Sequence, residues 1–394
     1  MEFDPFDYEQ DRDPYPVYRH LRDHEPAYYN ERLGFWALTR FDDCLQAFID
    51  WRTYSSARGT VLELMDKPLP PIIIFMDPPR HTQVRNLVSK AFTPRRIAAL
   101  EPQIREIATG YLDGLVGRAR FDAVKDFTAK LPMDVISALL GIPPEDRDAV
   151  RGWSNLVLHR DPDNPDPPPA ALEAMGKLLV YFDEALAERK TRPRDDMMTA
   201  LVEAELPGED GQPQRLTDVE IVSFFNLLAT AGNETVTKLL ATACYWLWRH
   251  PDQRRLLAED PRLVPNAVEE TLRYDPPSQY QGRVLTRDLE LHGERMPEGA
   301  RVMIVNGASG RDERRFPDPD RYDVRREIEV HLGFGYGRHI CLGAYLARLE
   351  SRIALAEFLR RFPEYEIPAD GIERMHSSNV RGFSGLAVEP ARPS

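Results

Sequence analysis

Apolar residues recur at spacings of three and four along most of the chain, which is the pattern of helices with one buried face. Short strands are expected at residues 34–39 and within residues 276–291, where a turn leads into them. The fold class is therefore mainly α with a small β region. Helices are expected over residues 14–23, 41–50, 93–115, 131–140, 145–159, 170–190, 217–250, 262–274 and 345–359.

The longest predicted helix begins at a capping box, in which Thr217 and Glu220 satisfy each other's backbone donors. It can run unbroken to His250, which is followed by proline. At about 1.5 Å per residue such a helix is on the order of 50 Å long. A helix of this length must cross the whole molecule. It is largely apolar except for one block of small and polar residues, Ala231 to Thr235.

The block from Ala231 to Thr235 favours a distortion of this helix. Gly232 costs about 1 kcal/mol inside a helix, and the Thr235 hydroxyl can bond back to the Ala231 carbonyl. Small residues also leave space, and buried polar residues without internal partners indicate water or ligand. A tolerated helix defect is the alternative interpretation. By helical spacing one face is formed by Leu227, Thr230, Ala231, Glu234 and Thr235.

A glycine-rich stretch near the C-terminus leads to a single cysteine, Cys341. Glycines at alternate positions, 333, 335 and 337, keep the backbone free of side chains, so a flat, bulky group could lie against it. The apolar spacing after Cys341 predicts a helix, whose N-terminus lowers the pKa of a thiol and favours the thiolate that ligates iron. The pattern predicts a haem-thiolate site, and a buried core cysteine in a glycine-rich turn is the alternative.

The composition restricts the class of protein. The chain has 394 residues, 42% hydrophobic and 29% charged, and no apolar run approaches the ~20 residues of a membrane span. The acidic N-terminus lacks the features of a signal peptide, and three scattered cysteines are too few for a disulfide framework. We therefore expect a soluble, cytoplasmic protein with no membrane partner. A net charge of −13 argues against a nucleic-acid partner.

The segment from Phe334 to Gly343, Phe-Gly-Tyr-Gly-Arg-His-Ile-Cys-Leu-Gly, resembles the haem-binding signature of cytochrome P450 monooxygenases. The block from Ala231 to Thr235 is similar to the oxygen-activation motif of the same family. A Glu-x-x-Arg motif at residues 270–273 also matches, in the family's order.

The resemblance covers the chain from about residue 10 to 390 and implies the P450 fold, as a single domain over residues 1–394. The long central helix would cross the molecule over haem b (iron protoporphyrin IX), with Cys341 as the axial ligand of the iron.

The resemblance also implies further haem contacts. His81 and Arg85 are four residues apart and share one face of a helix that starts near Pro79. In the family this pair donates to the anionic haem propionates, whereas alone it would be interpreted as a solvated helix face. The implied haem contacts are His81, Arg85, Ala231, Arg283, Phe334, Gly335, His339, Cys341 and Gly343.

Catalysis is assigned by resemblance to Thr235 and Glu234, which would deliver protons to bound oxygen. Glu270 and Arg273 would form a buried pair tied to Arg321, with a role in fold assembly and haem incorporation. The polar run at residues 278–281 indicates a substrate with some polar groups. The implied substrate contacts are Leu227, Thr230, Ala231, Ser278, Tyr280 and Val380.

The implied reaction inserts one oxygen atom from O2 into a lipophilic small molecule, such as a natural product, steroid, terpenoid or xenobiotic, by hydroxylation or epoxidation. A haem-thiolate peroxygenase, an isomerase and a non-catalytic haem sensor are the alternatives. The chain carries no flavin or iron–sulfur motif, so a separate ferredoxin-type protein is the expected electron donor. It would dock electrostatically on the proximal face of the haem. The basic residues placed there are Arg85, Lys90, Arg95, Arg96, Arg338, Arg348 and Arg352.

A proline-rich loop at residues 160–169 separates two of the predicted helices. Its prolines exclude a helix or a central strand, because they remove backbone donors and fix φ. A linker between domains is one interpretation, and a mobile substrate lid, which the family places here, is the other.

Overall fold

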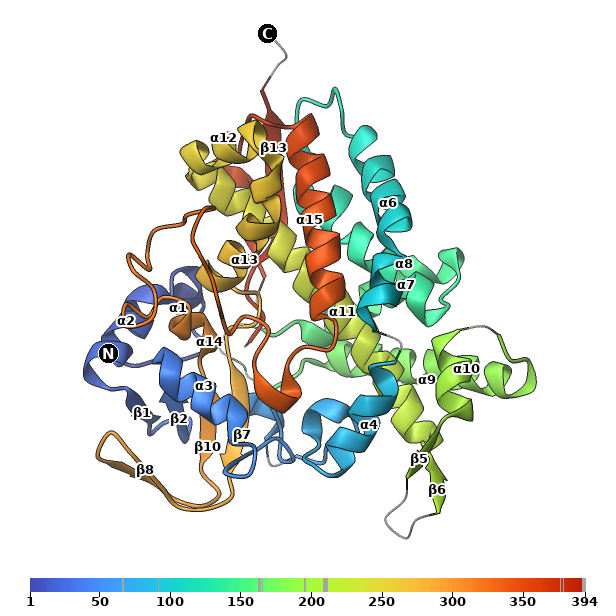
Figure 1. Ribbon diagram of the computed structural model, residues 1–394, viewed down its shortest axis with the longest axis vertical. Coiled ribbons are helices and arrows are strands. Elements are labelled where there is room, and N and C mark those ends of the chain that lie inside the picture. The colour runs from blue at the N-terminus through green and yellow to red at the C-terminus, as the bar shows by residue number, and fades with distance from the viewer. Residues whose placement is uncertain are drawn as a thin grey trace.

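The computed structural model describes residues 1–65, 67–90, 92–161, 164, 166–194, 196–207, 212–375, 377 and 379–391. Helices form most of the molecule, and short strands form a β region beside them (Figure 1). The mainly α fold with a small β region is therefore confirmed.

The helices are α1 (Tyr8–Arg12), α2 (Tyr15–His24), α3 (Phe41–Ile49), α4 (Arg80–Val88), α5 (Pro94–Ala98), α6 (Glu101–Asp113), α7 (Lys130–Leu140), α8 (Arg147–Leu158), α9 (Pro169–Thr191), α10 (Met197–Glu203), α11 (Asp218–Arg249), α12 (Pro251–Glu259), α13 (Val264–Tyr274), α14 (Asn306–Ser309) and α15 (Ala344–Arg361). The strands are β1 (Ala27–Asn30), β2 (Phe35–Leu38), β3 (Tyr54–Ser55), β4 (Phe121–Asp122), β5 (Glu205–Pro207), β6 (Pro213–Arg215), β7 (Gln281–Leu285), β8 (Leu289–Leu291), β9 (Glu294–Met296), β10 (Arg301–Ile304), β11 (Tyr365–Glu366), β12 (Ile372–Arg374) and β13 (Phe383–Pro390).

Helix α11 is the central element of the fold. It begins with the expected capping box of Thr217 and Glu220 and passes behind α15 in the view of Figure 1. It packs against α7, α8, α9, α13 and α15, so most of its residues are buried. Thr235 Oγ1 donates to the Ala231 carbonyl (2.8 Å), as predicted. The backbone nevertheless stays α-helical from Asp218 to Arg249, so the expected distortion does not interrupt the helix.

The single helix expected over residues 93–115 is two helices. α5 ends at Ala98, and α6 begins at Glu101. Pro102 occupies the first turn of α6, where its missing N–H costs nothing. Within a continuous helix the same proline would have removed a backbone hydrogen bond and clashed with the preceding turn.

In the β region, strands from the N-terminal part of the chain pair with strands from its last third. The five-stranded sheet has the order β1-β2-β10-β7-β3, in which β10 runs parallel to β2 and antiparallel to β7. A second sheet pairs β13 with β11, β12 and β4. The largest apolar cluster extends from Ile73 to Val388, and two smaller clusters flank the five-stranded sheet. From this continuity we propose that residues 1–394 form one domain.

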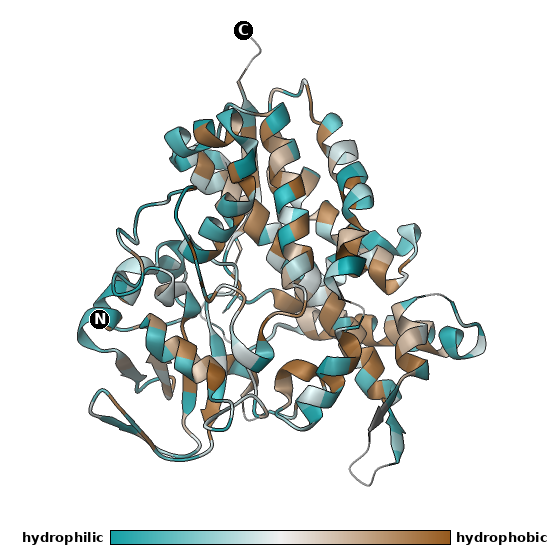
Figure 2. Ribbon diagram, viewed as in Figure 1, coloured by the Kyte–Doolittle hydropathy of each residue, from teal (hydrophilic) through white to brown (hydrophobic). Residues whose placement is uncertain are grey.

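Hydrophobic and hydrophilic residues are interspersed along α4 and α15 (Figure 2). The buried residues of α4 recur at the three- and four-residue spacing of a helix with one buried face, at His81, Val84, Leu87 and Val88. Most residues of α15 are buried, including the polar Glu350 and Ser351. Among the described residues no helix is both long enough and apolar enough to span a bilayer.

Candidate functional site

The loop that carries Cys341 is held by close backbone contacts. The Cys341 N–H donates to the Phe334 carbonyl (2.9 Å), which closes the loop. Gly337 has a φ of +68°, and a Cβ there would lie 2.7 Å from the Phe48 carbonyl oxygen. A Cβ on Gly333 would lie 2.6 Å from the carbonyl oxygen of residue 272. Glycine is therefore required because the loop touches the backbones of α3 and α13.

Cys341 is exposed, whereas Cys44 and Cys244 are buried. It precedes α15, and its carbonyl accepts from the Ala344 N–H (3.4 Å) at the start of that helix. The expected lowering of its thiol pKa is not found. Desolvation by the surrounding protein raises the pKa of Cys341, and the Gly343 N–H with the charge of Arg85 opposes this effect only in part. Metal binding is what would make this thiol a thiolate.

Four side chains that can carry positive charge gather beside the cysteine loop: His81 and Arg85 of α4, Arg283 of β7, and His339. The His81 and His339 rings lie 4.1 Å apart, centroid to centroid. Arg85 Nη2 donates to the Ile340 carbonyl (2.7 Å), next to Cys341. Helix α4 and strand β7 thus bring together residues that are far apart in sequence, as the resemblance implied.

These four groups lack carboxylate partners within the described part of the chain. Arg283 is only 3% exposed, and its Nη1 donates to the neighbouring Gly282 carbonyl (2.6 Å). Both ring nitrogens of the buried His81 have no hydrogen-bond partner. Within the described residues the other three side chains bond only to neutral groups. Such donors gathered at one place, one of them buried without any partner, indicate an anionic ligand.

Burial lowers the pKa of all four groups, and the neighbouring positive charge adds to this effect only for the two histidines. Desolvation and the charge of Arg85 lower the pKa of His81 to about 4. Desolvation and the charge of Arg283 lower the pKa of His339 to about 2. Burial lowers the pKa of Arg283 to about 10. An anion at this position would reverse each of these effects, since it favours the charged forms.

The predicted face of α11 is divided between two environments. Ala231 is exposed and Gly232 and Thr235 are half-buried, whereas Thr230, Asn233, Glu234 and Val236 are buried, so space adjoins one side of α11. Glu234 is buried and pairs with Lys238 (Oε2–Nζ 2.9 Å). The structure therefore separates the side chains of Glu234 and Thr235, which the sequence placed on one face.

The predicted substrate contacts have unequal support. Ser278 and Val380 form an isolated antiparallel bridge, so these two segments do meet. Leu227 is half-buried, and the buried Thr230 donates to the Asn226 carbonyl (3.0 Å). Tyr280 lies just before β7 and is buried in the apolar cluster formed with the N-terminal segment, so its assignment as a substrate contact stays a prediction.

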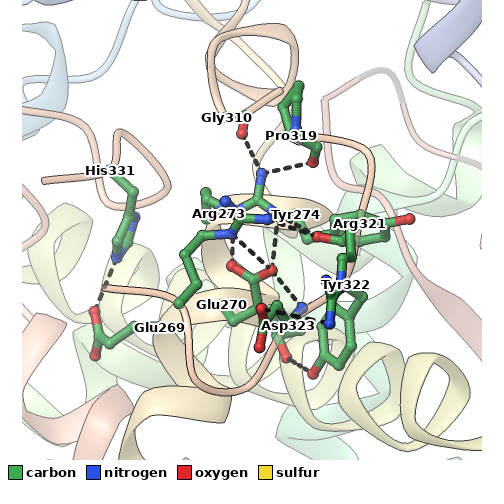
Figure 3. Close-up of polar contacts among 12 residues, drawn as sticks. Glu269, Glu270, Arg273, Tyr274, Gly310, Pro319, Arg321, Tyr322, Asp323 and His331 are labelled. Carbon is green, nitrogen blue, oxygen red and sulfur yellow. Dashed lines mark hydrogen bonds and ion pairs between the residues drawn. The ribbon is translucent and has the colours of Figure 1, made fainter. Parts of the chain in front are cut away.

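The Glu-x-x-Arg pair is buried, and Figure 3 shows its partners. Arg273 Nε lies 2.6 Å from Glu270 Oε2, and Arg273 also donates to the carbonyls of Gly310 (2.6 Å) and Pro319 (2.9 Å). The third arginine is Arg326, whose Nε lies 3.3 Å from Glu270 Oε1.

The assignment of Arg321 as that third arginine is wrong. Its side chain is 64% exposed, and only its carbonyl accepts from Arg273 (3.3 Å). The loop after Pro319 turns the Arg321 side chain outward, and Arg326 contacts Glu270 in its place.

A second network, which the sequence did not predict, anchors the cysteine loop. Glu269 accepts from His331 Nε2 (2.9 Å) and from two nitrogens of Arg348 (2.7 and 2.8 Å). It links α13, the loop and α15, and Arg348 lies over the Phe334 ring (4.6 Å). Burial alone would raise the pKa of Glu269, but the two partners outweigh it and lower that pKa to about 2. These residues are far apart in sequence and belong to no motif with fixed spacing.

These features fit iron protoporphyrin IX. An exposed cysteine supplies a metal ligand, four donor side chains without carboxylate partners among the described residues suit two carboxylates, and the exposed Ala231 leaves space beside α11. A Cβ on Gly343 would meet no atom within 4 Å, so the loop is open at this residue.

The family model described as Cytochrome P450 matches residues 172–387. The chain belongs to the cytochrome P450 family. Cytochrome P450 123 of Mycobacterium tuberculosis is 46% identical over 390 residues, which are 98% of this chain and 96% of that protein. The vitamin D(3) 25-hydroxylase of Pseudonocardia autotrophica is 39% identical, over 96% of this chain and 94% of that one. The structure of CYP109E1 from Bacillus megaterium with testosterone superposes with a TM-score of 0.89 at 31% identity, covering 98% and 99% of the two chains.

This P450 is accordingly a haem b-dependent monooxygenase of the bacterial type, with the P450 fold. Its structural neighbours are also P450 structures over nearly the whole chain, so the fold and the family lead to the same conclusion.

Proposed function

We propose that this P450 hydroxylates or epoxidises a lipophilic small molecule that carries some polar groups. The observation that carries the proposal is the position of the exposed Cys341 beside two arginines and two histidines that have no carboxylate partner among the described residues. Similar proteins support the substrate class. CYP109E1 has been crystallised with testosterone and with corticosterone, and the relative from Pseudonocardia is named for vitamin D(3).

The residues of the chain would divide the work of holding haem. Cys341 would ligate the iron, and haem, when bound, would supply the activation of O2. His81, Arg85, Arg283 and His339 would donate to the propionates, with the charge-assisted bonds that such carboxylates favour. Phe334, Gly335, Gly343 and Ala231 would lie against the ring.

Proton delivery is assigned to the helix that faces the haem. Thr235 would hold a water molecule at its Oγ1, and Glu234 would supply protons from the protein side. Substrate would be contacted by three residues of α11, Leu227, Thr230 and Ala231. It would also be contacted by Ser278 and Val380, which come from two other segments. Residues 162, 163 and 165 of the loop at residues 160–169 lie outside the described residues. That this loop is a mobile substrate lid therefore stays a prediction.

A ferredoxin-type donor is proposed to dock at the basic residues of α4, α5, α15 and the cysteine loop. Within the described residues Lys90, Arg95, Arg96 and Arg338 form no ion pair with a carboxylate, in a chain of net charge −13. Arg348 and Arg352 pair with Glu269 and Glu101. An acidic partner would therefore find unneutralised charge next to Cys341. Free thiols at all three cysteines agree with the proposed cytoplasmic location.

The test begins with the absorption spectrum of the reduced protein exposed to CO. A red-shifted Soret band, absent from Cys341→Ser and retained in Cys244→Ala, is expected. Absence of haem, or a band typical of histidine ligation, would overturn the proposed site. Product formed with ferredoxin, its reductase and O2 supports the monooxygenase reaction. Product formed with peroxide alone would favour a peroxygenase, and conversion without any oxidant an isomerase.

A further inference from the structure

Two short segments from distant parts of the chain lie side by side at the proposed substrate site. Residues 277–279 follow α13, and residues 379–381 precede β13. They meet at the antiparallel bridge of Ser278 with Val380. Two backbone hydrogen bonds join the segments, one on each side of this bridge (2.7 and 2.9 Å). Whatever holds the bridge therefore also places the two proposed substrate contacts that it contains.

The side chain of Arg381 lies behind this bridge. Successive side chains of an extended segment point to opposite faces, so Arg381 and Val380 point to opposite sides. Arg381 is 3% exposed, and its Nε lies 2.9 Å from Asp275 Oδ1. Asp275 is the residue that follows α13. Arg381 thus ties residues 379–381 to the end of α13, on the side away from Val380.

The carboxylate of Asp275 is itself firmly held. Its two oxygens accept from the Tyr15 hydroxyl (2.7 Å) and from the indole nitrogen of Trp246 (3.0 Å). Burial alone would raise the pKa of Asp275, but the charge of Arg381 and the further partners outweigh this effect and lower it. A buried ion pair whose other hydrogen bonds are also formed is a fixed anchor.

The guanidinium group of Arg381 also reaches helix α1. Its Nη1 lies 3.3 Å from Asp11 Oδ1, and its Nη2 donates to the Arg12 carbonyl (3.1 Å). A planar guanidinium can make these contacts and the contact with Asp275 at the same time, whereas the ammonium group of a lysine cannot. One side chain therefore connects the N-terminal helix, the end of α13 and the segment that carries Val380.

We propose that Arg381 is a positioning residue for substrate, which holds Ser278 and Val380 in place from behind, with α1 as its outer support. The inference rests on the proposed substrate contacts. Arg381 does not touch substrate in this arrangement and takes no part in the oxygen chemistry. Because the two segments are fixed before substrate arrives, binding orders fewer groups and loses less free energy.

Two iron ligands of different size test this role. Imidazole and clotrimazole both bind ferric haem iron through an imidazole nitrogen, but only clotrimazole carries aromatic rings that extend into the pocket. Titration of the holoprotein, followed by the Soret band, gives both dissociation constants. We expect Val380→Ala and Arg381→Lys each to weaken clotrimazole binding about fivefold. Imidazole binding should stay unchanged in both variants.

The double variant distinguishes positioning from a general loss of stability. If Arg381 acts through Val380, then Val380→Ala combined with Arg381→Lys binds clotrimazole no more weakly than the weaker single variant. Independent effects would instead multiply to about twenty-five-fold. Arg254→Lys is the matched control, because the similarly buried Arg254 divides its contacts between Glu364 (2.7 Å) and the Tyr365 carbonyl (2.8 Å). It should leave both dissociation constants unchanged.

Native clotrimazole affinity in Arg381→Lys, or losses that multiply in the double variant, would overturn the proposal. Native affinity in Val380→Ala would overturn the contact through which Arg381 is proposed to act, and the proposal with it. Should Arg381→Lys fail to take up haem, Asp11→Asn keeps the pair with Asp275 and weakens the contact with α1. It must then weaken clotrimazole binding without affecting imidazole.

The CO spectrum separates this inference from the proposed function. An Arg381→Lys protein that keeps the red-shifted band and the native clotrimazole affinity contradicts only the role of Arg381. Loss of the band in the unaltered protein contradicts the haem site itself.

Discussion

Arg326 Nε lies 3.3 Å from Glu270 Oε1, whereas the Arg321 side chain points into solvent. Replacing Arg326 by Gln removes one counter-charge from a fully buried carboxylate, which typically costs about 3 kcal/mol. Arg321→Gln changes an exposed side chain and should stay within about 0.5 kcal/mol. Unfolding by denaturant and the ratio of haem to protein measure both effects. Equal losses in the two variants would contradict the assignment of Arg326.

The Glu269 network makes stability depend on acid pH. The pKa of Glu269 in the folded protein is about 2, below its ordinary value of about 4.5. Its contribution, about 2–3 kcal/mol, is therefore present above about pH 4.5 and is lost as pH falls toward 2. Unfolding curves of the apoprotein between these limits should show a steeper decline for the native sequence than for Glu269→Gln. Glu106→Gln, at an exposed position of α6, is the control.

Arg283 should lower the stability of the apoprotein but strengthen the binding of haem in the holoprotein. It is a buried cation without a carboxylate partner among the described residues. Arg283→Met removes its desolvation cost, so the apoprotein should gain stability of about 1 kcal/mol. The same change removes a charge-assisted bond to a propionate, and haem should dissociate about tenfold faster. Arg287→Met, where the arginine is exposed, should alter neither quantity. Faster haem loss in both variants would argue against a specific contact.

Thr235→Ala should uncouple electron consumption from product formation. The hydroxyl that holds water at the proton path is lost, so reducing equivalents are spent without oxygen insertion. The ratio of product to NAD(P)H consumed, with peroxide measured as the by-product, should fall by about fivefold or more. Thr237→Val is the control, because that buried hydroxyl bonds to Asn233 and Thr128 carbonyls instead. Retained coupling in Thr235→Ala would exclude the role.

Charge reversal at Arg96 tests the docking surface. Arg96→Glu should lower the second-order rate of reduction by ferredoxin about tenfold at low salt, because steering depends on opposite charge. Salt should slow the native reaction and affect the variant less, since screening removes an attraction the variant lacks. Stopped-flow absorbance measures both. Arg19→Glu, at an exposed position of α2, is the matched control. A rate independent of salt in the native protein would contradict electrostatic docking.

Local patterns predicted those parts of the molecule whose signals are contiguous in sequence. The capping box and periodicity located α11 to within a residue at each end, and the glycine spacing located the cysteine loop. Even the break between α5 and α6 had a visible cause in Pro102. Such features depend on backbone preferences that act over a few residues.

Contacts between distant segments could not be predicted in this way. Arg321 and Arg326 are equally plausible partners of Glu270 until the loop conformation fixes which side chain turns inward. The same holds for His331 with Glu269, which tertiary packing alone brings together. The ion pair of Glu234 with Lys238 was not predicted either, because the burial of both side chains depends on segments that pack against α11 from elsewhere in the sequence.

The parallel pairing of β2 with β10 places residues 36–38 beside residues 302–304. During synthesis the N-terminal strands therefore emerge long before the strand that will lie beside β2. Until then β1 and β2 have an open edge, which is the kind of surface on which unfinished chains aggregate. The five-stranded sheet of this molecule can therefore be completed only after residues 301–304 have been synthesised.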